Sequence, residues 1–272
     1  MMRALYTAAS GMKAEQTNVD TISNNLSNVH TTGFKVQRTE FKSLLYQTIQ
    51  TRTTTANGEE KPVPAQVGLG TRVAATTSIY TRGSLLASES PTDFAIDGSG
   101  FFALRSIDGQ TVYTRNGNFT WAVDANGNTL LTNSEGWPVL DTEGNAIVVP
   151  ENVAAEAIEF QDDGRIGYRL PDGTYVDMEQ RFAIYQFNNP AGLEKLGSNN
   201  LMATAASGNP MLEGTVAGLK QSTILAKYIE GSNVNVADEM VNLIIAQRAY
   251  ELNSKAITTA DSMLDTANNL KR

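Results

Sequence analysis

Apolar residues spaced seven apart occur at both ends of this 272-residue chain, and they constrain its fold more than any other feature. Such a repeat places one apolar stripe along a helix, and the stripe must be buried against a partner. We therefore expect a helix at each end, with seam residues Leu5, Met12, Val19, Ile22, Leu26 and Val29 in the first and Val236, Leu243, Tyr250, Ile257 and Leu264 in the second. Tyr250 lies on the seam itself, so we expect its side chain to be buried.

The ends of both helices can be read from local residue types. The Thr-Thr-Gly sequence at 31–33 is typical of a helix end. Either Asn235 or Ser232 can cap the start of the second helix, because their side chains accept from free backbone N–H groups. Arg248 and Glu251 are three residues apart, which predicts an ion pair along the helix surface.

Between the helices the pattern changes to short β-rich segments separated by Asn-Gly and Asp-Gly turns. These turns favour antiparallel hairpins and predict an all-β domain over residues 67–225. The clearest segments lie at 100–104, 111–114, 118–121 and 181–185. Strands and helices do not alternate, which argues against a nucleotide-binding α/β fold. Trp121 and Trp137 are expected in the core of the β domain.

The expected fold class is α+β, with long terminal helices forming a coiled-coil-like core domain and a central antiparallel all-β domain. Segment 41–50 (FKSLLYQTIQ) is apolar and is either a short helix or a docking strand, whereas 51–64 is Thr-rich, Pro-bounded and typical of a linker. The expected domains are an N-terminal helix at 1–34, an extended linker at 35–66, the β domain at 67–225 and a C-terminal helix at 226–272.

Composition excludes several classes of function. The chain has no cysteine, so it has no disulfide, thiol nucleophile or Cys-type zinc site, and one histidine excludes a His-rich metal centre. A net charge of −8 argues against nucleic-acid binding. His30 with Ser27 or Asp20 lacks the nucleophile elbow of a hydrolase. We assign no catalytic residue from these patterns, and we expect no cofactor and no metal.

The sequence gives no sign of a membrane-spanning helix or of a cleavable signal peptide. No apolar stretch reaches the roughly 18 to 20 residues that a membrane helix needs. Polar residues within the first 16 positions interrupt the apolar core of a cleavable signal peptide. We expect neither membrane insertion nor cleavage of a leader.

The pattern alone leaves two kinds of function open, because isolated amphipathic helices are marginal in water and must find partners. In one, the helices pack within a monomeric binding or enzymatic protein built on the β domain. In the other, the termini associate with other copies of the chain and the β domain lies outside the assembly.

Motifs at both ends resemble those of the axial proteins of the bacterial flagellum, the rod and hook family. They lie at 21–35 (TISNNLSNVHTTGFK) and 232–264, and the segments at 93–102 and 113–119 also resemble family sequences. The matching residues are Asn24, Asn25, Asn28, Gly33, Phe34 and Lys35 in the first motif and Asn233, Asn235, Gln247, Arg248, Glu251, Asn253, Ser254 and Lys255 in the second.

The resemblance implies a structural subunit of the flagellar basal body that polymerises with itself into a helical tube and transmits motor torque across the periplasm to the hook. Paired terminal helices would line the tube, residues 35–66 would pack between neighbours, and the β domain would face outward. Segment 41–50 is similar to one typical of distal rod subunits, and a proximal rod or hook-like paralogue is the alternative.

The resemblance also implies a set of partners and a route. The partners are proximal rod subunits, the hook protein, the surrounding outer-membrane and peptidoglycan ring proteins and the flagellar export apparatus. Type III export would deliver the chain to the rod without cleavage of a signal peptide.

Overall fold

The computed structural model describes residues 2–50, 65–124, 127–149, 158–161, 164–169, 174–216 and 218–270. They form two compact units. Unit 1 comprises Met1–Ser27, Gln37–Ser78 and Asn235–Arg272, and unit 2 comprises Asn28–Val36 and Ile79–Val234. Helices at the two ends and antiparallel strands between them confirm the expected α+β class.

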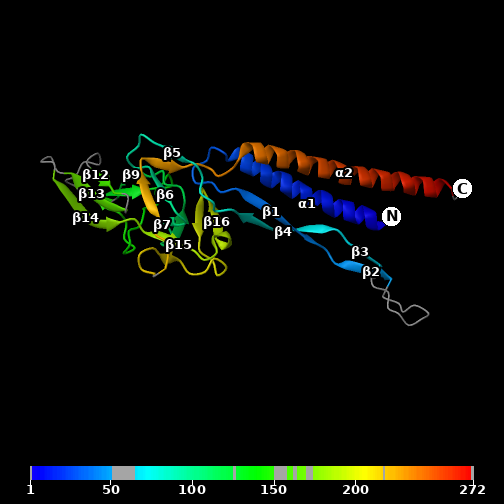
Figure 1. The fold of residues 1–272 in the computed structure, drawn as a ribbon, viewed down its shortest axis with the longest axis horizontal. Coiled ribbons are helices and arrows are strands. Elements are labelled where there is room, and N and C mark those ends of the chain that lie inside the picture. Colours follow the sequence, from blue (N-terminus) through cyan, green and yellow to red (C-terminus); the bar gives the residue numbers. More distant parts are fainter. Residues whose placement is uncertain are drawn as a thin grey trace. The chain divides into compact units, whose positions relative to one another are not determined.

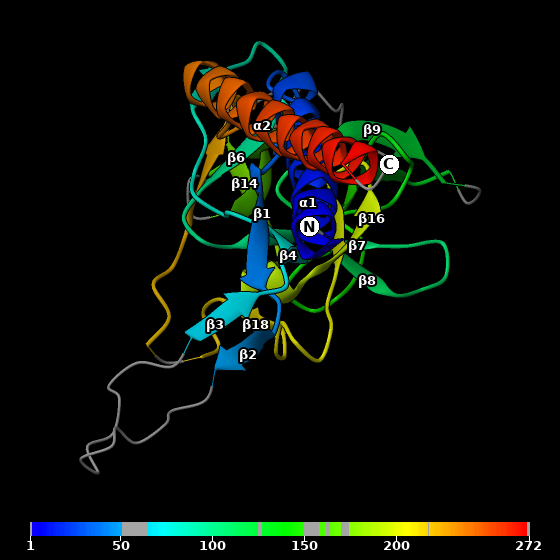
Figure 2. The same cartoon turned by 90° about the vertical axis from the view of Figure 1, so that its right-hand side faces the viewer.

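Two long helices dominate unit 1. Helix α1 (Met2–Ser27) has 26 residues and α2 (Val236–Asn269) has 34, so they are about 40 and 50 Å long. The two lie side by side along their length (Figures 1 and 2). The cap expected at Asn235 or Ser232 is Asn235, whose side chain accepts from the Ala237 N–H at 3.1 Å.

The helices run antiparallel and approach closely. Asn25, near the end of α1, donates to Glu239, near the start of α2, and Gly11 faces Asn253 farther along. A Cβ atom at Gly11 would lie only 2.9 Å from the Asn253 side chain. Small residues therefore set the spacing of the two backbones, and the buried ones are Ala8, Ala14, Ala246 and Ala260.

Two pairs of strands complete unit 1. β1 (Gln37–Ser43) pairs antiparallel with β4 (Thr71–Ser78), and β2 (Tyr46–Gln50) pairs with β3 (Ala65–Gly68). Segment 41–50 is thus the strand alternative, not the helix, because its residues belong to β1 and β2. The linker predicted at 51–64 lies outside the described residues.

The first strand pair packs on α1 through polar contacts. Thr39 Oγ1 donates to Thr21 Oγ1 at 3.0 Å, and the Thr71 N–H donates to Ser10 Oγ at 3.3 Å. These hydroxyl contacts fix β1 and β4 against one side of α1 and leave the side that faces α2 to small and apolar residues.

Unit 2 consists of short strands, and every ladder among its described strands is antiparallel. A six-stranded sheet has the order β16-β17-β8-β7-β15-β18, and smaller sheets surround it. The strands are β5 (Leu85–Ala87), β6 (Phe94–Asp97), β7 (Phe101–Arg105), β8 (Thr111–Thr114), β9 (Thr120–Val123), β10 (Thr129–Thr132), β11 (Val148–Val149), β12 (Ile158–Phe160), β13 (Arg165–Arg169), β14 (Tyr175–Arg181), β15 (Ile184–Gln186), β16 (Glu194–Gly197), β17 (Asn200–Met202), β18 (Met211–Leu212), β19 (Thr223–Ala226) and β20 (Tyr228–Glu230), with a short 3-10 helix at Pro190–Gly192.

The core of unit 2 is aromatic. Phe94, Phe102 and Phe182 are almost fully buried, and Phe182 contacts the other two rings in tilted and edge-to-face arrangements. Trp121 and Trp137 pack against this core while keeping part of their surface exposed, which confirms their expected place. Among the described residues, no helix is both long and apolar enough to cross a membrane.

Candidate assembly surface and its supporting contacts

The predicted seam residues lie mainly on the sides of the helices that face each other. Ile22 is buried, and the other described seam residues of α1 and α2 are half-buried, apart from Val236 and Tyr250. Val29 follows the end of α1 and belongs to unit 2. The seam residues that are half-buried are Leu5, Met12, Val19, Leu26, Leu243, Ile257 and Leu264.

The expected burial of Tyr250 is wrong for the single chain, in which 41% of its surface is exposed. It lines an open cavity of about 380 Å³ between the two helices, together with Gln16, Val19, Gln247 and Glu251. The open cavity leaves part of the Tyr250 ring without cover from α1.

The most exposed apolar residues of α2 lie on the side away from α1. At 100° per residue, positions 240, 241, 244, 245 and 252 share one face, opposite the buried positions 239, 246 and 260. This outward face consists of Met240, Val241, Ile244, Ile245 and Leu252, with exposed fractions between 53% and 68%. Large apolar side chains gathered on one face indicate an interaction surface.

The seven-residue repeat in the sequence does not include the residues of the outward face. The signal is the dense run at 240–245, which has more apolar residues than a single seam uses. A second apolar stripe on the same helix predicts a second partner, since α1 covers only one side.

Family-motif residues add charge to the outward face. Arg248 Nη1 donates to Glu251 Oε2 at 2.8 Å, which confirms the predicted ion pair. Both side chains are well exposed, so the pair contributes little stability to the single chain. Lys255 lies on the same face and is exposed.

The β2–β3 ribbon of unit 1 also exposes apolar side chains. Leu45, Tyr46 and Ile49 have exposed fractions of 82%, 63% and 61%, and Val67 and Leu69 are exposed as well. A two-stranded ribbon is marginal without a covering layer. It is therefore a second candidate surface for association.

Asn25 of the N-terminal motif connects three parts of unit 1. Its Nδ2 donates to the Gln37 carbonyl at 2.8 Å and to Glu239 Oε2 at 2.9 Å, and its Oδ1 accepts from the Gln37 N–H at 2.9 Å. The side chain is fully buried and Glu239 is 7% exposed. One amide thus joins α1, β1 and α2.

In unit 2, the connecting segment (residues 28–36) is held by backbone and side-chain contacts. The Gly33 N–H donates to the Glu230 carbonyl at 2.8 Å, and Asn199 Nδ2 donates to the Thr32 carbonyl at 2.7 Å. Gly33 has φ +70°, and a Cβ there would lie 2.8 Å from the Asn116 nitrogen. Glycine is therefore required by both conformation and space. Phe34 beside it is buried.

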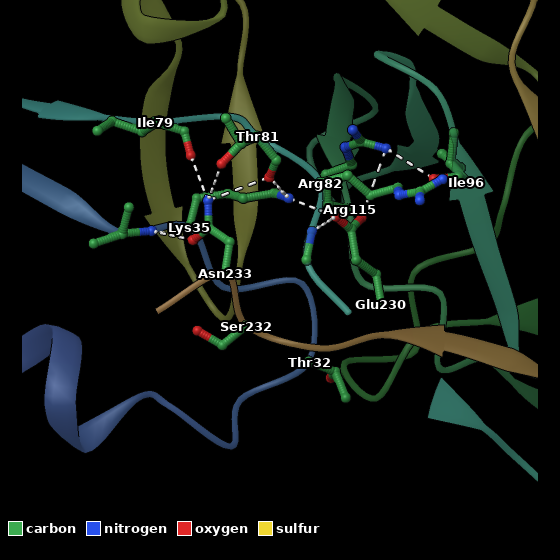
Figure 3. A network of polar contacts seen from close by, with 12 residues as sticks. Thr32, Lys35, Ile79, Thr81, Arg82, Ile96, Arg115, Glu230, Ser232 and Asn233 are labelled. Atoms are coloured by element: carbon green, nitrogen blue, oxygen red, sulfur yellow. Dashed lines mark hydrogen bonds and ion pairs between the residues drawn. The ribbon is translucent and has the colours of Figure 1, made fainter. Parts of the chain in front are cut away.

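Lys35 makes a buried ion pair with Glu230 (Figure 3). Its Nζ lies 2.6 Å from Glu230 Oε1 and donates to the Thr81 carbonyl at 2.7 Å, and the Gly83 N–H donates to the same carboxylate oxygen at 2.9 Å. Burial lowers the pKa of Lys35 below its usual value, although the carboxylate of Glu230 acts in the opposite direction.

Arg115 approaches the same carboxylate from another strand end (Figure 3). Its Nη1 lies 3.6 Å from Glu230 Oε2, and its Nη2 donates to the Gly98 carbonyl at 2.6 Å. The guanidinium also lies 5.4 Å from the centre of the Phe101 ring. Two cations therefore share one buried carboxylate, which joins three segments of unit 2 that are far apart in the sequence.

Asn233 of the C-terminal motif ties separate segments of unit 2 together. Its Oδ1 accepts from the Val36 N–H at 2.7 Å, and its Nδ2 donates to the Ile79 carbonyl at 2.9 Å and to Thr81 (Figure 3). It thereby holds the end of the connecting segment beside the residues that follow β4.

The remaining motif residues have varied surroundings. Asn253 faces Gly11 across the helix pair, and Asn28 Oδ1 accepts from Thr31 Oγ1 at 3.0 Å. Asn24 and Gln247 are exposed and Ser254 is half-buried. His30 is exposed as well, and no group of metal-ligating side chains is found in the part of the chain that the structure describes.

Three family models match the chain in order. The model "Flagella basal body rod protein" matches residues 5–35, "Flagellar hook protein FlgE/F/G D1 domain" matches 95–168, and "Flagellar basal body rod FlgEFG protein C-terminal" matches 225–270. The first and last of these contain the motif residues that make the contacts described above.

Full-length relatives decide the assignment. The chain is 44% identical to "Flagellar basal-body rod protein FlgG" of Borreliella burgdorferi, over the whole of both chains. The chain belongs to the family of flagellar basal-body rod proteins. It is also 36% identical to FlgG of Bacillus subtilis and 30% identical to "Flagellar hook-basal body complex protein FlhP" of the same organism, each over the whole of both chains. These findings agree with the resemblance of the terminal motifs.

Proposed function

We propose that this chain is a structural subunit of the distal rod of the flagellar basal body and that it polymerises with copies of itself into a helical tube. Its likeness to proteins named FlgG over their full length supports the distal rod over a proximal rod or hook-like paralogue. A contact between copies that does not close into a ring generates an open helical filament.

The outward face of α2 is the observation that carries this proposal. One side of α2 is already covered by α1, and the five apolar residues on the other side remain exposed. Burying a side chain of this kind is worth about 1.5–3 kcal/mol, so neighbouring copies that cover the face gain several kcal/mol for each subunit. In the tube, helices of adjacent copies then pack in a coiled-coil-like manner.

The domain arrangement and partners follow from this assembly. In the proposed tube, helices α1 and α2 line the inside, strands β1 and β2 at residues 37–50 pack between copies, and the β-rich unit 2 forms the exterior. The rod spans the periplasm, meets proximal rod subunits and the hook protein at its ends, passes through the ring proteins, and transmits torque. The flagellar export apparatus delivers the chain to the growing rod.

The test is a single charge on the outward face. Ile245→Asp removes an exposed apolar side chain and adds a charge, whereas Asn242→Asp adds the same charge on the flank of the same helix. We expect Ile245→Asp to abolish filaments in negatively stained micrographs and to abolish motility, with both retained in Asn242→Asp. Normal rods in Ile245→Asp would contradict the proposal.

A further inference from the structure

Small side chains recur along the contact between α1 and α2. Four of the eight buried residues of the two helices are alanines, and Gly11 lies opposite Asn253. On α2 the positions seven residues on either side of Asn253 are Ala246 and Ala260, both buried. A shift of α2 by seven residues would therefore place another small side chain opposite Gly11, so shape alone selects the alignment weakly.

One polar contact distinguishes the observed alignment from the shifted ones. Asn25 Nδ2 donates to Glu239 Oε2 at 2.9 Å, and both side chains are buried. A seven-residue shift would move these groups apart by about 10 Å and leave a buried carboxylate without its donor. Losing a buried hydrogen bond to a charged group changes an equilibrium by about tenfold or more.

Asn25 is held in place independently of α2. Its Oδ1 and Nδ2 bond both backbone groups of Gln37 in β1, so its amide is oriented before α2 is considered. In the part of the chain that the structure describes, the Glu239 carboxylate bonds the Asn25 amide and has no comparable second anchor. Asn25 therefore has a fixed orientation on α1, and Glu239 can bond it only when α2 is aligned as observed.

We propose that Glu239 is a positioning residue that sets the register of α2 on α1 by bonding Asn25. A single buried polar residue is the best-attested way to fix alignment in a helix pair whose apolar contacts permit several. The inference concerns contacts within one chain, so it stands apart from the proposed polymerisation.

Cross-linking of the full-length chain tests the register directly, because the natural chain has no cysteine. The native reporter is Gly11→Cys with Asn253→Cys, and the shifted reporters are Gly11→Cys with Ala246→Cys or with Ala260→Cys. Products are formed by mild oxidation and scored as disulfides within a single chain. Only cysteines whose Cα atoms lie within about 7 Å can be joined.

With Glu239 in place, we expect only the native reporter to cross-link. Glu239→Met should raise the yield of a shifted reporter relative to the native one by about tenfold. Glu239→Gln, which still accepts from Asn25, should restore the native pattern. Asp238→Met removes an exposed carboxylate from the same helical turn and should leave the pattern unchanged.

A relocated carboxylate provides a second test that does not depend on loss of a contact. In Glu239→Met/Ala246→Glu the acceptor lies seven residues later, so α2 should shift and the Gly11→Cys/Ala260→Cys reporter should become the dominant product. The proposal is overturned if this variant still joins positions 11 and 253. It is also overturned if Glu239→Gln behaves like Glu239→Met, if Asp238→Met shifts the pattern equally, or if positions 11 and 253 do not cross-link in the unaltered background.

Discussion

Replacing Lys35 by methionine tests whether the buried ion pair between Lys35 and Glu230 stabilises unit 2. Methionine keeps the length of the side chain and removes its charge, so Glu230 loses the cation at 2.6 Å and keeps Arg115 at 3.6 Å. The side chains of Lys35 and Glu230 are only 5% and 0% exposed. Removing one partner of a buried pair costs about 3–5 kcal/mol, because the remaining charge cannot return to water.

The chain offers both a selective assay and a matched control. Its two tryptophans, Trp121 and Trp137, pack against the core of unit 2, so their fluorescence during urea unfolding reports the free energy of unfolding of that unit. Arg82 forms an ion pair with Asp97 in which both side chains are about half exposed. Arg82→Met should therefore cost less than about 1 kcal/mol.

The pH dependence of the free energy of unfolding provides an independent test, because the pKa of Lys35 fixes its direction. Because burial lowers the pKa of Lys35, the unfolded chain binds this proton more tightly than the folded chain does between the lowered value and 10.5. The ionisation of Lys35 therefore adds stability as pH rises toward 10.5, and the deficit of Lys35→Met should widen over that range. A deficit equal to that of Arg82→Met at neutral pH, or one that narrows with rising pH, would refute this reasoning.

Two further substitutions test other contacts in unit 2. Burial raises the pKa of Tyr113 to about 12, so the folded chain retains a proton that the unfolded chain loses near pH 10. The free energy of unfolding should therefore fall between pH 10 and pH 12 by up to about 1.4 kcal/mol per pH unit. Tyr113→Phe should remove that slope when the free energy is measured by urea unfolding at each pH. An unchanged slope in Tyr113→Phe would disagree. Gly33→Ala should cost more than Gly109→Ala, because both glycines have a similar positive φ but only Gly33 faces a backbone nitrogen at 2.8 Å; equal losses of about 1 kcal/mol in thermal unfolding would show that space at Gly33 is unimportant.

Local sequence patterns predict the elements of this fold well. The seven-residue repeat locates both helices because helical periodicity is a property of neighbouring residues. Turn dipeptides likewise locate hairpins, and β8 occupies the predicted 111–114. Segment 181–185 is less regular, since β14 ends at Arg181 and β15 begins at Ile184. Segment 41–50 was ambiguous because a short apolar run suits either a helix or a strand.

Contacts between distant residues are beyond such patterns. Lys35 and Glu230 are 195 positions apart, and nothing near either residue specifies the other. The motif resemblance includes Lys35, Asn233 and, within segment 113–119, Arg115, but it does not include Glu230. Periodicity predicts Tyr250 on the seam, but it cannot predict the open cavity between the helices that leaves part of the ring exposed.

The 195-residue separation of Lys35 and Glu230 also bears on biosynthesis. A ribosome adds roughly 5–20 residues each second, so some 10–40 s pass between the synthesis of the lysine and that of its carboxylate. During that interval the nascent chain has a Lys35 cation without its carboxylate partner, and unit 2 is incomplete. Any factor that binds the nascent chain therefore binds it before unit 2 can fold, because the last fifth of the sequence supplies Glu230.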